Sequence, residues 1–307
     1  MIASIAIALS LTLAAPATAR ADLVLPGTGG VKYRENTSDP VRLTAYGLGT
    51  GRTTLRSPTG DTFTWGKTLA EVSVAPGGRL AAGVPKTYRS GYDALILTDR
   101  ATGTATRIPT VRKPMTASYV SWSRDAKRVA LTVERKGSVL GFTIVDVVAK
   151  RARTVRLSGL HRDAGFWWSP DGNLIARHGT GLRVHRASDG AVVRTYRDAG
   201  RPTGPEDAFS PSGTRLATWC PARFKERLCL VNPVTGTITR RVNVRPQALF
   251  GWWDESHVIA VTAHGTAYRL SVLDVRGGGI TRVLATLPAK TWAADLWFSF
   301  TRNARGS

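Results

Sequence analysis

The sequence predicts an all-β protein in which one four-stranded unit is repeated around a ring. Two repeat markers run in step along the chain, and no long apolar stripe of helical period competes with them. The first marker is a strand, a tight polar turn and a second strand, repeated about every 45 residues; its anchor positions are Ala75, Ser123, Ser169, Ser210 and Trp253. The second marker is a hairpin turn near Gly51, Gly103, Lys150, Gly190, Gly236 and Gly278.

The residues at the first marker explain its turn. The clearest copies run from Phe166 to Ala176 and from Ala208 to Ala217, a fair copy runs from Val120 to Ala130, and weaker copies begin at Val72 and Gly251. Proline sets φ at the turn and glycine or aspartate closes it. Two hairpins in each unit are typical of the four-stranded antiparallel blade of a β-propeller.

The two ends of the chain predict how the ring closes. Residues 31–57 supply three outer strands without a preceding anchor, and residues 291–300 supply a first strand with nothing after it. Joined, they make one split blade, because an open ring would leave two blade faces unburied. We therefore expect six blades, with five or seven as alternatives if the weak ends are misread.

The turn motifs also carry a resemblance to a known family. Trp-Ser-Pro-Asp-Gly at 168–172 and Phe-Ser-Pro-Ser-Gly at 209–213, each followed by Leu-Ile-Ala or Leu-Ala, resemble the TolB-type, WD40-like repeat of secreted bacterial propellers. The Gly-His and Trp-Asp dipeptides of WD40 blades are not at their usual places. The resemblance implies an interaction platform that holds a peptide or partner protein through its rim or central channel.

The N-terminus and the cysteines indicate export. Residues 1–21 read as a signal peptide, with an apolar stretch from Ile2 to Ala15 and cleavage after Ala19 or Ala21. The mature chain, 22–307, is then a single propeller domain without a membrane span, secreted or associated with the cell envelope.

Cys220 and Cys229 are the only cysteines, and in an exported protein they predict a disulfide. No histidine lies close enough to favour a metal site instead.

Two repeated side-chain types have structural explanations. One aromatic residue ends the first strand of four units, and we expect these residues to fill the wedges between blades rather than stack on a ligand: Trp122, Trp168, Phe209 and Trp252. Arginine recurs in the predicted last strand, where charge blocks edge-to-edge association: Arg56, Arg107, Arg156, Arg194, Arg240 and Arg282.

The net charge of +22 is the one compositional outlier, and the excess of Arg over Lys fits a GC-rich genome as well as a function. Loops between second and third strands and loops between blades share one face, which we call the rim. They carry the candidate binding residues Lys86, Arg89, Arg135, Lys136, His161, Arg162, Asp163, His178, Arg223 and Lys225. Such a rim attracts anionic partners in a salt-dependent way. A solvated basic surface without a ligand is the plainer alternative.

The sequence thus predicts a monomeric, non-catalytic exported propeller that binds a protein or peptide. The alternative is an envelope-associated binder of an anionic polymer; nucleic acid is a less suitable partner in that compartment. A secreted hydrolase or lyase is disfavoured because the inner strands are short of acids. A base or metal site would need His161 and His178 to meet on the rim beside Asp163, but loop histidines often coincide by chance. No cofactor and no metal are expected.

Overall fold

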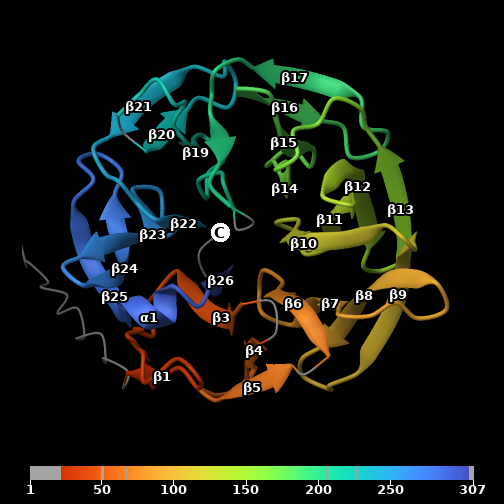
Figure 1. Cartoon of the computed structure of the whole chain (residues 1–307), viewed down its shortest axis with the longest axis horizontal. Coiled ribbons are helices and arrows are strands. Elements are labelled where there is room, and N and C mark those ends of the chain that lie inside the picture. The colour runs from red at the N-terminus through yellow and green to blue at the C-terminus, as the bar shows by residue number, and fades with distance from the viewer. Residues whose placement is uncertain (1–21, 50–51, 67, 205–206, 226, 304–307) are drawn as a thin grey trace, which may run out of the picture.

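The computed structural model describes residues 22–49, 52–66, 68–204, 207–225 and 227–303. The predicted signal peptide, residues 1–21, lies outside the described residues. Within them, six four-stranded antiparallel sheets surround a central channel, and a two-stranded sheet lies outside the ring (Figure 1). The predicted six-bladed β-propeller is confirmed.

Five blades follow one another along the chain, each starting with its innermost strand. Blade I contains β6 (Leu69–Val74), β7 (Leu80–Pro85), β8 (Tyr92–Asp99) and β9 (Ala105–Arg112). Blade II contains β10 (Thr116–Trp122), β11 (Arg128–Arg135), β12 (Ser138–Asp146) and β13 (Arg151–Arg156). Blade III contains β14 (Phe166–Trp168), β15 (Leu174–His178), β16 (Gly181–His185) and β17 (Val192–Tyr196). Blade IV contains β18 (Arg201–Pro202), β19 (Leu216–Trp219), β20 (Leu228–Val231) and β21 (Ile238–Val242). Blade V contains β22 (Ala248–Trp252), β23 (His257–His264), β24 (Ala267–Asp274) and β25 (Ile280–Pro288).

Blade VI joins the two ends of the chain, as expected. Its innermost strand β26 (Leu296–Arg302) pairs with β3 (Val41–Leu48), and β4 (Arg52–Arg56) and β5 (Phe63–Gly66) complete it. The pairing is antiparallel and places Phe298 opposite Tyr46.

The bounds of blade VI differ from the predicted 31–57 and 291–300. The outer strands occupy 41–66, and a short helix α1 (Ala289–Trp292) precedes β26. The predicted turn position Gly51 lies outside the described residues, between the second strand β3 and the third strand β4. The turn between β4 and β5 is formed by residues 57–62, where the amide of Ser57 donates to Thr62 O. Arg56 therefore lies in the third strand, and its predicted place in an exposed last strand is wrong. The other five arginines of that series do lie in last strands.

The polar turn of the repeat is held by its own side chains. In blade III the Ser169 hydroxyl donates to Asp171 at 2.5 Å, and the amide of Ser169 donates to Asn173 O. Gly172 adopts a φ of 76°, which glycine accepts without strain. Blade II repeats the serine–aspartate contact between Ser123 and Asp125 at 2.6 Å.

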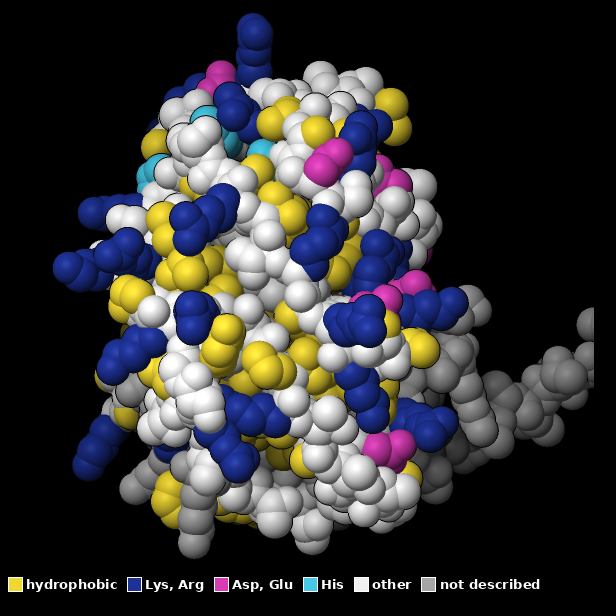
Figure 2. Space-filling view, turned by 90° about the vertical axis from the view of Figure 1, so that its right-hand side faces the viewer, with side chains coloured by type: hydrophobic (Ala, Val, Ile, Leu, Met, Phe, Trp, Pro, Cys, Tyr) yellow, Lys and Arg dark blue, Asp and Glu magenta, His cyan; other side chains and the backbone are white. Residues whose placement is uncertain are grey.

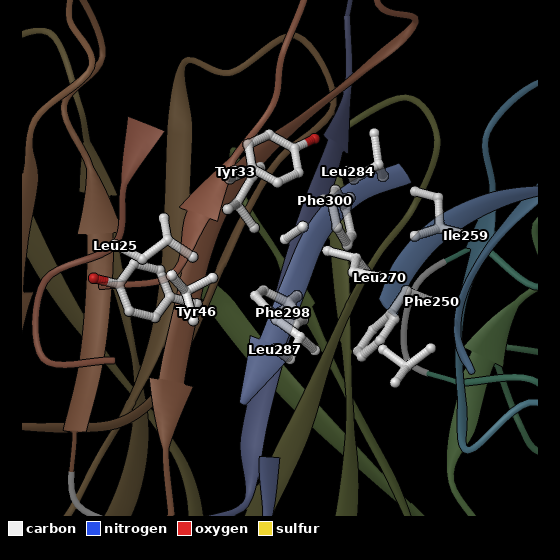
Figure 3. Close-up of a cluster of buried hydrophobic side chains, with 14 of the residues drawn as sticks. Leu25, Tyr33, Tyr46, Phe250, Ile259, Leu270, Leu284, Leu287, Phe298 and Phe300 are labelled. Carbon is white, nitrogen blue, oxygen red and sulfur yellow. The ribbon is translucent and has the colours of Figure 1, made fainter. Parts of the chain in front are cut away.

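The apolar core is divided among the blade interfaces. Each pair of neighbouring blades encloses its own hydrophobic cluster. The most extensive lies between blades V and VI, where Phe250 packs against Phe298 and Phe300 (Figure 3). Stability therefore comes from stacking each sheet on the next, and the ring must be closed to bury the last face.

An N-terminal arm, residues 22–40, covers the outside of this V–VI interface. It contains the two-stranded sheet of β1 (Leu23–Val24) and β2 (Lys32–Tyr33). Leu25 and Tyr33 of the arm enter the V–VI cluster (Figure 3). Buried Glu35 accepts two hydrogen bonds from Arg56, at 2.8 and 2.7 Å. The arm thus fastens blade VI by apolar packing and by a buried ion pair.

The predicted disulfide is present between Cys220 and Cys229. Cys220 directly follows β19 and Cys229 lies in β20, so the bond closes the loop between these strands. No helix in the described part of the chain is long and apolar enough to cross a membrane.

Candidate binding site at the channel

A cavity of about 390 Å³ opens at one end of the central channel. It lies on the face formed by the turns between first and second strands and between third and fourth strands, which we call the turn face. The rim is the opposite face. Four tryptophan side chains contribute to the walls of this cavity: Trp122, Trp167, Trp168 and Trp252. We call it the channel cavity.

Hydrogen bonds between blades fix these aromatic walls. The indole N–H of Trp122 donates to Ser73 O at 3.2 Å, and that of Trp168 donates to Ser121 O at 2.9 Å. Trp252 makes the same contact with Ala208 O at 2.9 Å. Trp168 and Trp252 are buried, as expected for wedge residues, while Trp122 is half-buried. Because each indole is fixed by a hydrogen bond at its edge and by packing against its face, these rings form a preorganised apolar wall.

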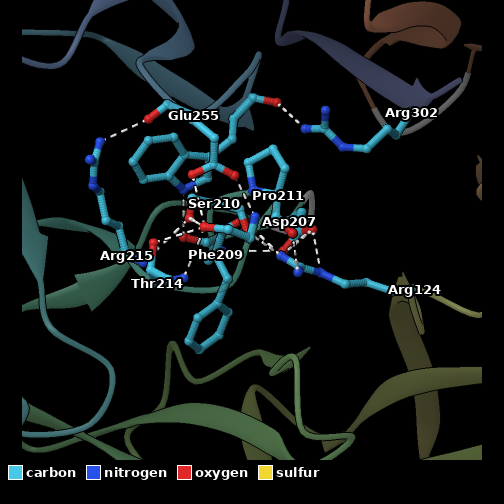
Figure 4. Close-up of polar contacts among 12 residues, drawn as sticks. Arg124, Asp207, Phe209, Ser210, Pro211, Thr214, Arg215, Glu255 and Arg302 are labelled. Atoms are coloured by element: carbon cyan, nitrogen blue, oxygen red, sulfur yellow. Dashed lines mark hydrogen bonds and ion pairs between the residues drawn. The ribbon is translucent and has the colours of Figure 1, made fainter. Parts of the chain in front are cut away.

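An ion pair between Arg124 and Asp207 lines the channel cavity. Arg124, in the turn after β10 of blade II, reaches past blade III to blade IV (Figure 4). Its Nε lies 2.9 Å from Asp207 Oδ2, and its terminal nitrogens donate to Ser210 O at 2.6 Å and Pro211 O at 2.8 Å. Burial raises the pKa of Asp207, and the Arg124 charge opposes that rise.

Arg302 supplies a second cation on the wall. It ends β26, and its guanidinium donates to Trp252 O at 2.8 Å and Trp253 O at 3.2 Å (Figure 4). In the part of the chain that the structure describes, these carbonyl oxygens are its only hydrogen-bond acceptors. Burial lowers the pKa of Arg302 and the Arg124 charge lowers it further, while the charges of Asp207, Glu255 and Asp254, none of them in contact with Arg302, oppose the shift. The channel cavity therefore combines apolar walls with one weakly compensated positive charge.

A strained residue lies on the channel wall in blade II. Tyr119, in the bulge of β10, has a φ of 59° and a side chain that is half exposed. The carboxylate of Glu71, from β6 of blade I, accepts hydrogen bonds from the amides of Tyr119 and Val120 at 2.8 and 2.5 Å. Burial raises the pKa of Glu71 despite these bonds. The contact holds the bulge in place and presents the Tyr119 ring.

The residues predicted on the rim lie in loops between second and third strands, in one loop between blades, or at the ends of adjoining strands. Lys86 and Arg89 follow β7; Arg135 and Lys136 lie at the β11–β12 turn; Arg223 and Lys225 lie in the β19–β20 loop. His161, Arg162 and Asp163 lie between β13 and β14, and His178 ends β15. Arg223 pairs with Asp198 at 3.2 Å and covers the Phe224 ring. None of these residues lines the channel cavity.

The three residues considered as a base or metal site are only partly brought together. Asp163 lies 3.6 Å from His161 Nδ1 and 3.5 Å from Arg177. The Nε2 atom of His178 is buried and has no hydrogen-bond partner among the residues described. Within those same residues, no group of three or more His, Cys, Asp or Glu side chains is arranged to hold a metal ion.

The sequence contained a signal for the missed Arg124. The anchor serines Ser123, Ser169 and Ser210 align, so Arg124 occupies the position held by Pro170 and Pro211 in the next two blades. A charged residue that replaces a turn proline at the channel end marks a departure from the repeat. Arg302 had no comparable signal, because its blade carries no recognisable turn motif.

Comparisons with known proteins agree with this architecture. No protein-family model matches the sequence, and no curated protein matches it. Among solved structures, TolB from Acinetobacter baumannii is similar, with a TM-score of 0.53 and 18% identity over 88% of this chain and 67% of that chain. The propeller domain of the Trilobed protease from Pyrococcus furiosus has a TM-score of 0.53 and 11% identity, over 83% of this chain and 79% of its own. An oligogalacturonate lyase in complex with manganese has a TM-score of 0.54 and 12% identity, over 86% and 82%.

These likenesses establish the fold, which is consistent with the TolB-type resemblance. The Trilobed protease propeller is described as having an open velcro topology, whereas here β26 and β3 close the ring. Because the same fold occurs in a lyase, function has to be argued from the site.

Proposed function

We propose that this chain is a non-catalytic, exported propeller that binds an extended segment of a partner protein in the channel cavity. The observation that supports the proposal is the channel cavity itself, with fixed tryptophan walls beside the weakly compensated Arg302. Apolar walls suit a large side chain, and the guanidinium suits a neighbouring acidic residue. The partner segment is therefore expected to carry an aromatic or aliphatic residue next to an aspartate or glutamate.

Export is part of this proposal. It is supported by the Cys220–Cys229 disulfide, because such bonds persist in oxidising compartments. The N-terminal signal read from residues 1–21 adds to it.

The experiment compares capture of envelope proteins by the wild type and by two tryptophan variants. Trp167→Ala removes part of the cavity wall, whereas Trp65→Ala removes an exposed tryptophan from β5 at the outer edge of blade VI. A partner held by the wild type and by Trp65→Ala, and lost by Trp167→Ala, supports the proposal. Equal recovery by all three proteins contradicts it. Turnover of an oligosaccharide or lactone by the purified chain, abolished in His161→Ala, would overturn the non-catalytic assignment.

The excess of basic side chains supports a second candidate, binding of an anionic envelope polymer at the rim. Figure 2 shows the outer side of the ring that includes β9 and β13 and adjoins the rim; Lys and Arg side chains are spread over it with few Asp or Glu between them. Binding of this kind weakens steeply as salt is raised. Retention on a teichoic-acid-type polymer that does not change between low and high salt would dismiss it.

A further inference from the structure

The interface between blades VI and I has the smallest apolar cluster of the ring. Its buried members are Ala45, Val72, Val74 and Ala81. A second cavity, of about 290 Å³, opens at the turn-face end of this interface, and we call it the seam cavity. It has walls from both blades and borders the channel cavity at Arg302. It is about ten times the ~30 Å³ that one water molecule occupies in the liquid.

Arginine dominates the lining of the seam cavity: Arg42, Arg56, Arg79, Arg100 and Arg302. Two of these cations are neutralised locally. Arg56 contacts Glu35 and also Asp61, at 2.7 and 2.6 Å. Arg79, which is largely exposed, pairs with Asp99 at 3.2 Å.

Arg100 is held between the two blades without such compensation. Its terminal nitrogens donate to Gly78 O at 2.5 Å in blade I and to Arg56 O at 2.6 Å in blade VI. Its Nε is buried and has no hydrogen-bond partner within the described chain. Burial lowers the pKa of Arg100, and the charges of Arg56 and Arg42 lower it further. A guanidinium in this state lacks a counter-charge.

Arg42, from β3 of blade VI, lines the same cavity opposite Arg100 of blade I. Arg42 reaches Glu35 at 3.7 Å, but Arg56 already holds both oxygens of that carboxylate at shorter distances. The Arg302 guanidinium is directed to blade V, where it donates to Trp252 O and Trp253 O, so it does not belong to this group. Guanidinium groups from two blades, Arg42 and Arg100, thus line one small polar space, and Arg100 has no carboxylate in contact.

We propose that the seam cavity is a binding site for a phosphate-type oxyanion, held by Arg42 and Arg100. Planar guanidinium groups bind such oxyanions through paired, charge-assisted hydrogen bonds. A dianion compensates several cations at once, which a single carboxylate does not. It also joins blade VI to blade I at the interface with the least apolar packing, so binding stabilises the closed ring.

The test measures thermal unfolding of the full chain in inorganic phosphate, with sodium chloride and sodium acetate at the same ionic strength as references. We expect phosphate to raise the unfolding midpoint in a saturable way above the values in the two references, which change it only by screening the net positive charge. Arg100→Gln is expected to raise the dissociation constant for phosphate about tenfold, as the loss of one hydrogen bond to a charged group predicts. An equal rise in acetate, or none in phosphate, would overturn the proposal.

Arg100→Gln also removes the hydrogen bonds by which Arg100 joins blades I and VI, so the variant could unfold more easily for that reason alone. A second variant separates loss of phosphate binding from loss of stability. Arg42→Gln removes a cation that makes no hydrogen bond in the described structure and does not line the channel cavity. It weakens phosphate binding while partner capture by the channel cavity persists, which separates this proposal from the proposed function. Arg151→Gln, an exposed arginine on the outer strand of blade II, is the matched control and leaves phosphate binding unchanged. The same affinity in all three variants and the wild type would contradict the site.

The source of the phosphate is distinguished by vesicles. Phosphatidylglycerol vesicles that bind the wild type but not Arg42→Gln identify a lipid headgroup. Binding of inorganic phosphate without vesicle binding identifies a soluble phosphate or phosphoester.

Discussion

Arg124 and Asp207 join blades II and IV across the channel, with Arg124 Nε 2.9 Å from Asp207 Oδ2. The two side chains are 34% and 30% exposed, so the pair is screened only in part. Because Arg124 also donates to the carbonyl groups of the Ser210–Pro211 turn, it connects two blades that are not neighbours.

Replacing this arginine tests how much the bridge stabilises the ring. Arg124→Gln is expected to lower the free energy of unfolding by about 1 kcal/mol, since partial exposure reduces the value of a bond to a charged group. A double-mutant cycle with Asp207→Asn in denaturant unfolding measures the coupling, expected at about 0.5–3 kcal/mol for residues in direct contact. Additive effects of the two changes would show that the pair contributes no coupling energy.

Loss of the ion pair between the N-terminal arm and blade VI is expected to lower the free energy of unfolding more than loss of the Arg124 bridge. Glu35→Gln leaves Arg56 buried with reduced compensation, and breaking a buried pair typically costs about 3–5 kcal/mol. Arg186→Gln removes one partner of the exposed Arg186–Asp189 pair and should cost far less, because water and salt screen an exposed pair. Denaturant unfolding of both variants checks the contrast. Similar small losses would mean that the arm does not fasten blade VI.

The disulfide is expected to stabilise blade IV. It closes a short loop, with a sequence separation of 9 between the cysteines. Loop-closure entropy then predicts a loss of about 2–3 kcal/mol when both cysteines are changed to serine. Urea unfolding of the double variant provides the measurement. Reductant should destabilise the wild type and leave the double variant unaffected, and a wild type insensitive to reductant would argue against this contribution.

His185 predicts a dependence of stability on pH. It is buried in β16, and its Nδ1 lies 3.0 Å from Gly190 O. Burial lowers its pKa, and Arg183 lowers it further. The unfolded chain, with a histidine pKa of about 6.5, then binds more protons than the folded chain just below that pH. Stability is therefore lost as pH falls through that window towards the lower folded pKa.

The variant His185→Phe isolates this contribution, because it keeps a ring against Phe166 and cannot titrate. Its denaturation midpoint should fall less than that of the wild type between about pH 7 and about pH 5. An identical fall in both proteins would assign the acid sensitivity to other groups.

The repeat was predictable because its information is local. A serine, proline and glycine in one turn determine that turn, and the first-strand aromatic residues directly precede it. Blade VI was harder, because residues 49–51 and 57–60 both contain turn-forming residues. Choosing the first as the outer hairpin placed Arg56 in an edge strand. Its burial depends on Glu35, which approaches only after the N-terminal arm folds over the V–VI interface.

The candidate site was less predictable for the same reason. Arg124 and Asp207 are far apart in the sequence and meet only because the ring brings blades II and IV to a common channel. The residues predicted on the rim share a face, as expected, but which face holds a cavity depends on how side chains fill the channel. Spacing along the chain does not determine that filling.

The antiparallel pairing of β3 with β26 also has a consequence for the order of folding. As a nascent chain lengthens, blades I to V can stack in turn, but β3, β4 and β5 must wait for a strand that is made after all of them. Such distant pairings form slowly because a very long loop has to close. Until then β3 has an unpaired edge, so a chaperone that shields it would be most useful to this protein late in its synthesis.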